Sequence, residues 1–111
     1  VSVFQPHLYS RTQEFYKEFA NAFKASDVLI VTDVYPAREK PISGVSGAMV
    51  SNSARKTGHK HVHYVPNLDD IAVHLDNIVQ PGDMVLTIGA GTIWRYSESY
   101  YEHLKTLEAA A

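Results

Sequence analysis

The chain has 111 residues, of which 45% are hydrophobic, and it carries a formal net charge of −2. This length fits one domain with its own core, and the charge provides no basic surface for nucleic acid or an anionic membrane. Cysteine is absent, which excludes disulfides, thiolate metal sites and a thiol nucleophile. No apolar run approaches the ~20 residues that span a bilayer, and no signal peptide is visible, so we expect a cytoplasmic protein. The abrupt start at Val1 is typical of a domain cut from a longer protein.

Two strands and one helix are predicted in the first third of the chain. Residues 1–4 have the composition of the end of a buried strand, and residues 27–32 are a continuous β-rich run, typical of a strand covered on both faces. Between them, Ser10 and Gln13 fit the capping box of a helix N-terminus. The apolar stripe of this helix is predicted at Phe15, Phe19, Ala22 and Phe23.

The middle of the chain predicts two further helices around a third strand. A long connection over residues 33–46 leads to a weaker helix over 46–57, with Gly58 as its C-terminal stop. Residues 61–65 form the third strand, and Asn67 caps the helix that follows. The buried side of that helix is predicted at Leu68, Ile71, Ala72, Leu75, Ile78 and Val79.

A fourth strand is predicted over residues 83–88, before a last helix that starts near Ile93. The core side of this helix is predicted at Tyr96, Tyr100, Leu104 and Leu107. Strands that alternate with helices predict an α/β fold, a Rossmann-like three-layer domain with a mainly parallel sheet of about four or more strands. In the common strand order 3-2-1-4, the loops that start at Gln5 and Gly89 face each other across one crevice, where such sheets bind ligands.

Both of these loops carry candidate binding residues. His7, Tyr9 and Arg11 bring polar chemistry to the first loop. The second loop is a candidate ligand loop because its small residues allow close approach: Gly89, Ala90 and Gly91. Structural roles remain open, since His7 could cap backbone carbonyls, Arg11 could be a solvated helix residue, and the glycines could serve only a tight turn. Trp94 is expected to pack in the core rather than to stack on a substrate.

Two groups of polar residues suggest other kinds of site, a zinc site and an acid–base pair. His59, His61 and His63 alternate, so they share one face of an extended strand, as zinc ligands can. No fourth ligand is evident, and we predict no metal site. Asp33 and Glu39 could form a carboxylate pair for acid–base catalysis, but we expect both to be solvated charged residues of a loop.

Three segments resemble, in order, the C-terminal domain of the Mur ligases of peptidoglycan synthesis. They are Phe-Gln-Pro-His-Leu-Tyr-Ser-Arg-Thr at 4–12, Asp-Val-Tyr-Pro-Ala-Arg-Glu-Lys-Pro-Ile at 33–42 and Gly-Ala-Gly-Thr-Ile-Trp at 89–94. The resemblance spans residues 3–94, and the first segment is its longest and most specific part.

The resemblance implies that residues 1–111 are a single domain, the amino-acid-binding and ATP-closing C-terminal domain of a three-domain ligase. In such a ligase the first domain holds UDP-N-acetylmuramate, and the central domain binds most of ATP and Mg²⁺. The sugar carboxylate becomes an acyl phosphate, which the amine of L-alanine attacks. The resemblance also implies that His7 and Arg11, with Tyr9 between them, bind the amino acid.

Other features limit what these residues can do alone. The phosphate loop G-x-x-x-x-G-K-[ST] is absent, and Trp94 occupies the third glycine position of a dinucleotide-binding pattern. We therefore expect no catalytic residue here and no activity from the fragment by itself. The family often has a basic residue where this chain has Leu8, and aspartate where it has Thr92. The alternative function is a stand-alone α/β module that binds a small anion or nucleotide without catalysis.

Overall fold

The computed structural model describes residues 1–110 and contains a four-stranded sheet in which every neighbouring pair is parallel. The strand order is β3-β2-β1-β4, so the predicted α/β class and strand order are confirmed. Each strand is shorter than predicted: β1 Ser2–Phe4, β2 Leu29–Val31, β3 Val62–Tyr64 and β4 Leu86–Ile88. In the register of the sheet, Val3 at the centre of β1 lies opposite Ile30 and Thr87.

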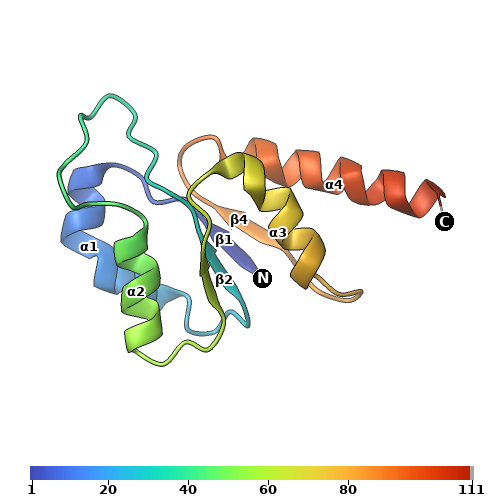
Figure 1. Ribbon diagram of the computed structural model, residues 1–111, viewed down its shortest axis with the longest axis horizontal. Coiled ribbons are helices and arrows are strands. Elements are labelled where there is room, and N and C mark those ends of the chain that lie inside the picture. The colour runs from blue at the N-terminus through green and yellow to red at the C-terminus, as the bar shows by residue number, and fades with distance from the viewer. Residues whose placement is uncertain (111) are drawn as a thin grey trace.

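Helices cover both faces of this sheet (Figure 1). The helical elements are α1 Tyr9–Ala22, α2 Ala48–Lys56, the 3₁₀ turn η1 Leu68–Asp70, α3 Ile71–Ile78 and α4 Ile93–Ala110. The connections from β1 to β2 and from β2 to β3 run in the same direction, so right-handed crossovers place α1 and α2 on one face. The connection from β3 to β4 runs back across the sheet, which places α3 on the other face with α4.

The alternation of side chains along the strands divides the core into two layers. Phe4, Leu29 and Val31 pack with α1 and α2, whereas Val3 and Ile30 pack with α3 and α4. All five side chains are buried. The three-layer prediction is therefore confirmed, and it leaves the carboxyl ends of the strands free to carry loops.

The start and the buried face of α1 differ from the prediction. The N-cap is Leu8 rather than Ser10, and its side chain makes no capping hydrogen bond. The predicted stripe is wrong at Phe15, which is 39% exposed, and at Ala22, which is exposed. The residues that α1 and its C-cap bury or half-bury are Tyr9, Thr12, Tyr16, Phe19, Ala20 and Phe23. Thr12 can be buried because its hydroxyl donates to the Leu8 carbonyl 2.8 Å away, a partner that an apolar-stripe argument does not count.

The other predicted helix signals are mostly confirmed. Gly58 has a positive φ of 97° just after α2, and the Asn67 side chain accepts a hydrogen bond from the backbone N–H of Asp69. The prediction for α4 is only partly right, because Tyr100 is buried but Leu104 and Leu107 are 39% and 51% exposed. The C-terminal part of α4 extends beyond the sheet (Figure 1).

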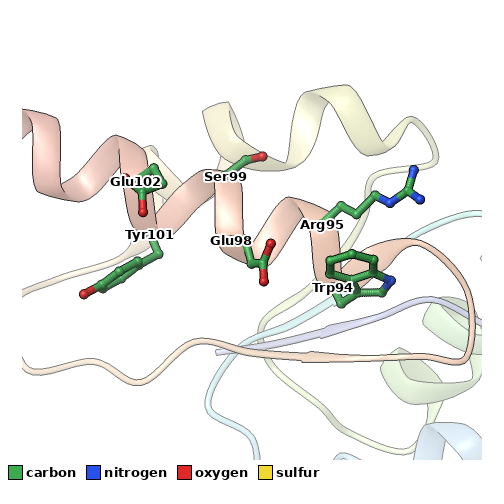
Figure 2. Close-up of a pocket in the computed structure, with 6 residues that line it drawn as sticks. All are labelled: Trp94, Arg95, Glu98, Ser99, Tyr101 and Glu102. Atoms are coloured by element: carbon green, nitrogen blue, oxygen red, sulfur yellow. The ribbon is translucent and has the colours of Figure 1, made fainter.

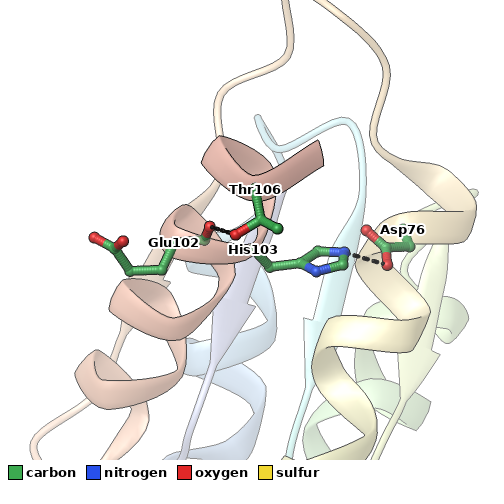
Figure 3. Close-up of polar contacts among 4 residues, drawn as sticks. All are labelled: Asp76, Glu102, His103 and Thr106. Atoms are coloured by element: carbon green, nitrogen blue, oxygen red, sulfur yellow. Dashed lines mark hydrogen bonds and ion pairs between the residues drawn. The ribbon is translucent and has the colours of Figure 1, made fainter. Parts of the chain in front are cut away.

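A polar contact joins α3 to α4 on this side of the molecule. The His103 Nε2 atom lies 2.9 Å from the Asp76 carboxylate, and both side chains are 41% exposed (Figure 3). Burial, with Asp76 nearby, raises the pKa of Tyr100 above its ordinary value. Within residues 1–110, no helix has the length and apolarity needed to cross a membrane.

Candidate functional site

The loops after β1 and β4 meet at the carboxyl end of the sheet, because these two strands are neighbours. Gln5, which is 3% exposed, links the two loops by hydrogen bonds. Its backbone N–H donates to the Ile88 carbonyl at 2.9 Å, and its side-chain oxygen accepts from the backbone N–H of Ile93 at 3.2 Å. A Cβ placed on Gly89 would lie 3.0 Å from the Gln5 carbonyl oxygen, so the two loops are in direct contact.

The loop after β2 joins the same cluster through Tyr35. The Tyr35 backbone donates to Pro6 at 2.8 Å and accepts from Leu8 at 2.9 Å, which continues the parallel pairing beyond β1 and β2. The Tyr35 ring is stacked on His7, with 6.0 Å between the ring centroids and 17° between the planes. A Cβ placed on Gly91 would lie only 2.5 Å from Tyr35 Cγ. One aromatic ring therefore contacts both loops that the sequence singled out.

The N-terminus of α1 is capped by a carboxylate from this third loop. Glu39 accepts from the backbone N–H of Tyr9 at 2.5 Å, from the backbone N–H of Ser10 at 3.1 Å, and from the Ser10 hydroxyl. The hydrogen bond from the Ser10 side chain is the main reason that the pKa of Glu39 lies below its ordinary value; the backbone donors and nearby His7 act in the same direction. An anion at a helix N-terminus also interacts favourably with the helix dipole.

Asp33 has a comparable role at a different helix. Its Oδ1 atom accepts from the backbone N–H of Val34 at 2.9 Å and of Gly47 at 3.1 Å, just before α2. Burial, with Asp33 nearby, raises the pKa of Tyr64. Asp33 and Glu39 thus accept hydrogen bonds at the starts of two different helices, α2 and α1.

The predicted amino-acid-binding residues follow one another around a strained turn. His7 and Tyr9 are half-buried, and Arg11 is exposed as the third residue of α1. Between His7 and Tyr9, Leu8 adopts φ 67° and ψ 138°, which is rare for any residue other than glycine. Such a conformation costs about 1–3 kcal/mol and persists where its surroundings enforce it. Within residues 1–110, the Arg11 guanidinium has no ion-pair partner.

The second loop is more enclosed by protein than the sequence suggested. Gly89 and Ala90 are exposed, but Gly91 is half-buried, and the Tyr35 ring lies on the side where a Cβ would be. Neither glycine has a positive φ. The absence of a side chain at Gly91 therefore serves close packing against Tyr35.

A hollow of about 870 Å³ lies elsewhere, on the outer face of α4 (Figure 2). It is lined by Trp94, Arg95, Glu98, Ser99, Tyr101 and Glu102. Trp94 is 53% exposed there, so its predicted place in the core is wrong. The Arg95 guanidinium lies 5.3 Å from the centroid of the Trp94 ring. All six residues come from one helix face, whereas three loops converge at the carboxyl end of the sheet, and we assign the candidate site to those loops.

The histidine row lies at the opposite edge of the sheet. His61 is exposed, and the half-buried His63 on β3 contacts the ring of His74, with 5.4 Å between centroids. Burial, followed by the nearby His74, lowers the pKa of His63. Among residues 1–110, no three histidine, aspartate or glutamate side chains are grouped as metal ligands would be.

Sequence reasoning missed Tyr35 and Glu39 as parts of this cluster. Both lie in the segment 33–42, in which the resemblance assigned no role to Tyr35, and Glu39 was considered only as a possible acid–base partner of Asp33. The available signal was the position of this segment after the second strand, because the carboxyl ends of parallel strands share one edge.

The sequence model of the family described as "Mur ligase, glutamate ligase domain" matches residues 1–91. The chain belongs to the Mur ligase family. It is similar to three proteins named UDP-N-acetylmuramate–L-alanine ligase, with 53% identity in Salinibacter ruber, 47% in Geotalea uraniireducens and 46% in Geobacter sulfurreducens. The matches cover 95%, 95% and 99% of this chain but 22%, 23% and 24% of those proteins. The chain thus spans about a quarter of the length of these Mur ligases, and the family resemblance stated from the sequence is confirmed.

Proposed function

We propose that the full-length protein is an ATP-dependent ligase that joins L-alanine to UDP-N-acetylmuramate in the cytoplasm during peptidoglycan synthesis. This chain would be its C-terminal domain, which binds the amino acid and closes over ATP. The names of relatives at 43–53% identity support this reaction. The observation that carries the proposal is the convergence of three loops around Tyr35, which brings the His7 loop and the Gly89 loop together at the carboxyl end of the sheet.

Arg11 is the residue best placed to bind the carboxylate of the amino acid. The first two backbone N–H groups of α1, those of Tyr9 and Ser10, already donate to Glu39. An incoming carboxylate must therefore be bound mainly by side chains. Arg11 is exposed on the first turn and has no ion-pair partner among the described residues. An arginine can donate two parallel hydrogen bonds to one carboxylate, which fixes both its position and its orientation.

His7 and Tyr9 complete the proposed amino-acid site. The stacking of His7 on Tyr35 orients the imidazole, and Tyr9 is half-buried directly before Ser10 at the start of α1. In the proposed reaction, the amine of L-alanine attacks the carbonyl carbon of an acyl phosphate formed from the sugar carboxylate, and inorganic phosphate leaves. The chain's contribution is to hold the amine in an orientation from which it can attack.

ATP and Mg²⁺ are proposed as cofactors of the full-length protein, held mainly by its other domains. The second loop lacks the G-x-x-x-x-G-K-[ST] pattern of a phosphate-binding loop, and its Gly91 packs against the Tyr35 ring. Among residues 1–110, no acidic cluster offers a place for a metal ion. These observations support a dependent role for the domain, and its relatives' greater length favours this role over a stand-alone binding module.

The proposal is tested by measuring phosphate release by the full-length protein with UDP-N-acetylmuramate, ATP and Mg²⁺. L-alanine and glutamate should be compared, because the family description names glutamate whereas the relatives' names contain L-alanine. We expect turnover with L-alanine only, and none from the 111-residue chain alone. Preference for glutamate, or turnover by the isolated chain, would contradict the proposal.

A further inference from the structure

We propose that Glu39 is a positioning residue of the amino-acid site: its carboxylate fixes the first turn of α1 and thereby sets His7 and Arg11 at the spacing that binds the substrate carboxylate. This inference rests on the proposed function. The inference adds Glu39 to the proposed site. Glu39 comes from a different loop, about 30 positions along the chain from Tyr9 and Ser10, which it binds.

The contacts of Glu39 concentrate on the two residues between His7 and Arg11. Its carboxylate accepts from the backbone N–H of Tyr9 at 2.5 Å, from the backbone N–H of Ser10 at 3.1 Å and from the Ser10 hydroxyl. Three donors on two consecutive residues define where the helix begins. The direction in which Arg11 leaves the first turn follows from that start.

Glu39 is itself anchored to the same segment through its own loop. Its backbone N–H donates to the Pro36 carbonyl at 2.9 Å, which closes a turn just after Tyr35. Tyr35 is paired through its backbone with Pro6 and Leu8. The loop therefore holds the His7 segment on both sides: Tyr35 pairs with Pro6 and Leu8, and Glu39 binds the two residues after Leu8.

A direct role for Glu39 in binding the substrate carboxylate is opposed by its charge. Its lowered pKa, caused first by the Ser10 side chain, keeps it ionised at neutral pH, and two carboxylates repel each other. Its oxygens also already accept three hydrogen bonds. Among the described residues, every side-chain hydrogen bond of Glu39 goes to Tyr9 or Ser10, so its effect on the site is transmitted through the start of α1.

The test measures steady-state kinetics of Glu39→Gln and Ser10→Ala in the full-length ligase. Glu14→Gln is the matched control, because Glu14 is an exposed glutamate on α1, the helix whose start Glu39 binds. We expect Glu39→Gln to raise KM for L-alanine about 10-fold or more, while KM for ATP changes less than about twofold. Ser10→Ala removes one of the three donors and should give a smaller rise in the same constant. In the double variant the two effects should not add, because both changes break one contact.

The outcomes separate this inference from the function on which it rests. An inactive wild-type ligase would overturn the proposed function and the inference with it. An active wild type with the same alanine KM in Glu39→Gln and Glu14→Gln would overturn the inference alone. Equal rises in the KM values for alanine and ATP would show a general loss of structure and would also overturn it. Ser10→Ala keeps this decision possible if Glu39→Gln fails to fold.

Discussion

Replacing Gly91 by alanine tests whether Tyr35 joins the two loops of the site. The new Cβ would lie 2.5 Å from Tyr35 Cγ and 2.8 Å from both Cδ atoms, whereas ordinary contacts begin near 3.4 Å. The ring would have to move by about 1 Å, and it is held by its stacking on His7 and by backbone pairing with Pro6 and Leu8. The movement would therefore disturb the packing around His7.

The expected cost can be estimated from overpacking in other cores, which destabilises proteins by about 1–3 kcal/mol. For a domain of this size, 1 kcal/mol lowers the thermal midpoint by roughly 4–8 °C. Gly91→Ala should therefore lower the midpoint of the 111-residue chain by about 4–24 °C. Thermal unfolding followed by circular dichroism measures this, and a cooperative transition is expected because the domain has its own core.

A double-mutant cycle identifies the ring as the cause. In a Tyr35→Ala background the new methyl group has room, so Gly91→Ala should cost at least about 1 kcal/mol less than it does in the wild type. Ala90→Ser, an exposed change in the same loop, is the control and should leave the midpoint nearly unchanged. The reasoning is refuted if the thermal midpoint of Gly91→Ala lies within about 1 °C of the wild type. It is also refuted if Gly91→Ala lowers stability as much in the Tyr35→Ala background as in the wild type.

Two further predictions concern the opposite edge of the sheet and the helix pair. Burial, and then His74, lower the pKa of His63 below 6.5, so the unfolded chain binds its proton more tightly and folding stability falls as the pH drops below about 6.5. His63→Gln should reduce the loss of thermal midpoint between about pH 7.5 and 5.5, and an unchanged loss would contradict this. Asp76→Asn should lower the free energy of unfolding by less than about 1 kcal/mol, because both partners of its contact with His103 are 41% exposed. A larger loss in urea unfolding would show that this contact organises α3 and α4.

The sequence predicted the parts of the fold that follow from local patterns and handedness. Alternating strands and helices imply a parallel sheet, and right-handed crossovers leave few strand orders, so the meeting of the Gln5 and Gly89 loops could be expected. The turn signals at Gly58 and Asn67 are local and were also recognised.

The remaining features depend on contacts that sequence spacing does not reveal. Ser10 has the pattern of a cap, but a carboxylate 29 positions away supplies the cap instead. Thr12 is buried because a backbone carbonyl satisfies its hydroxyl. Trp94 has a large apolar side chain of the kind that usually packs in a core, yet it lies on the outer face of α4 (Figure 2). Tyr35 gains its role only when β1 and β2 are paired.

The most direct test of the account is the KM for L-alanine of Arg11→Ala in the full-length ligase. A hydrogen bond to a charged group contributes roughly 1.5–3 kcal/mol, so this constant should rise by about 10- to 150-fold while KM for ATP moves much less. Arg11→Lys should recover only part of the loss, because a point charge cannot form the two-point contact. Arg95→Ala, which removes an exposed arginine on α4, is the control and should behave like the wild type. An unchanged alanine KM in Arg11→Ala would place the amino-acid site elsewhere and contradict the central claim.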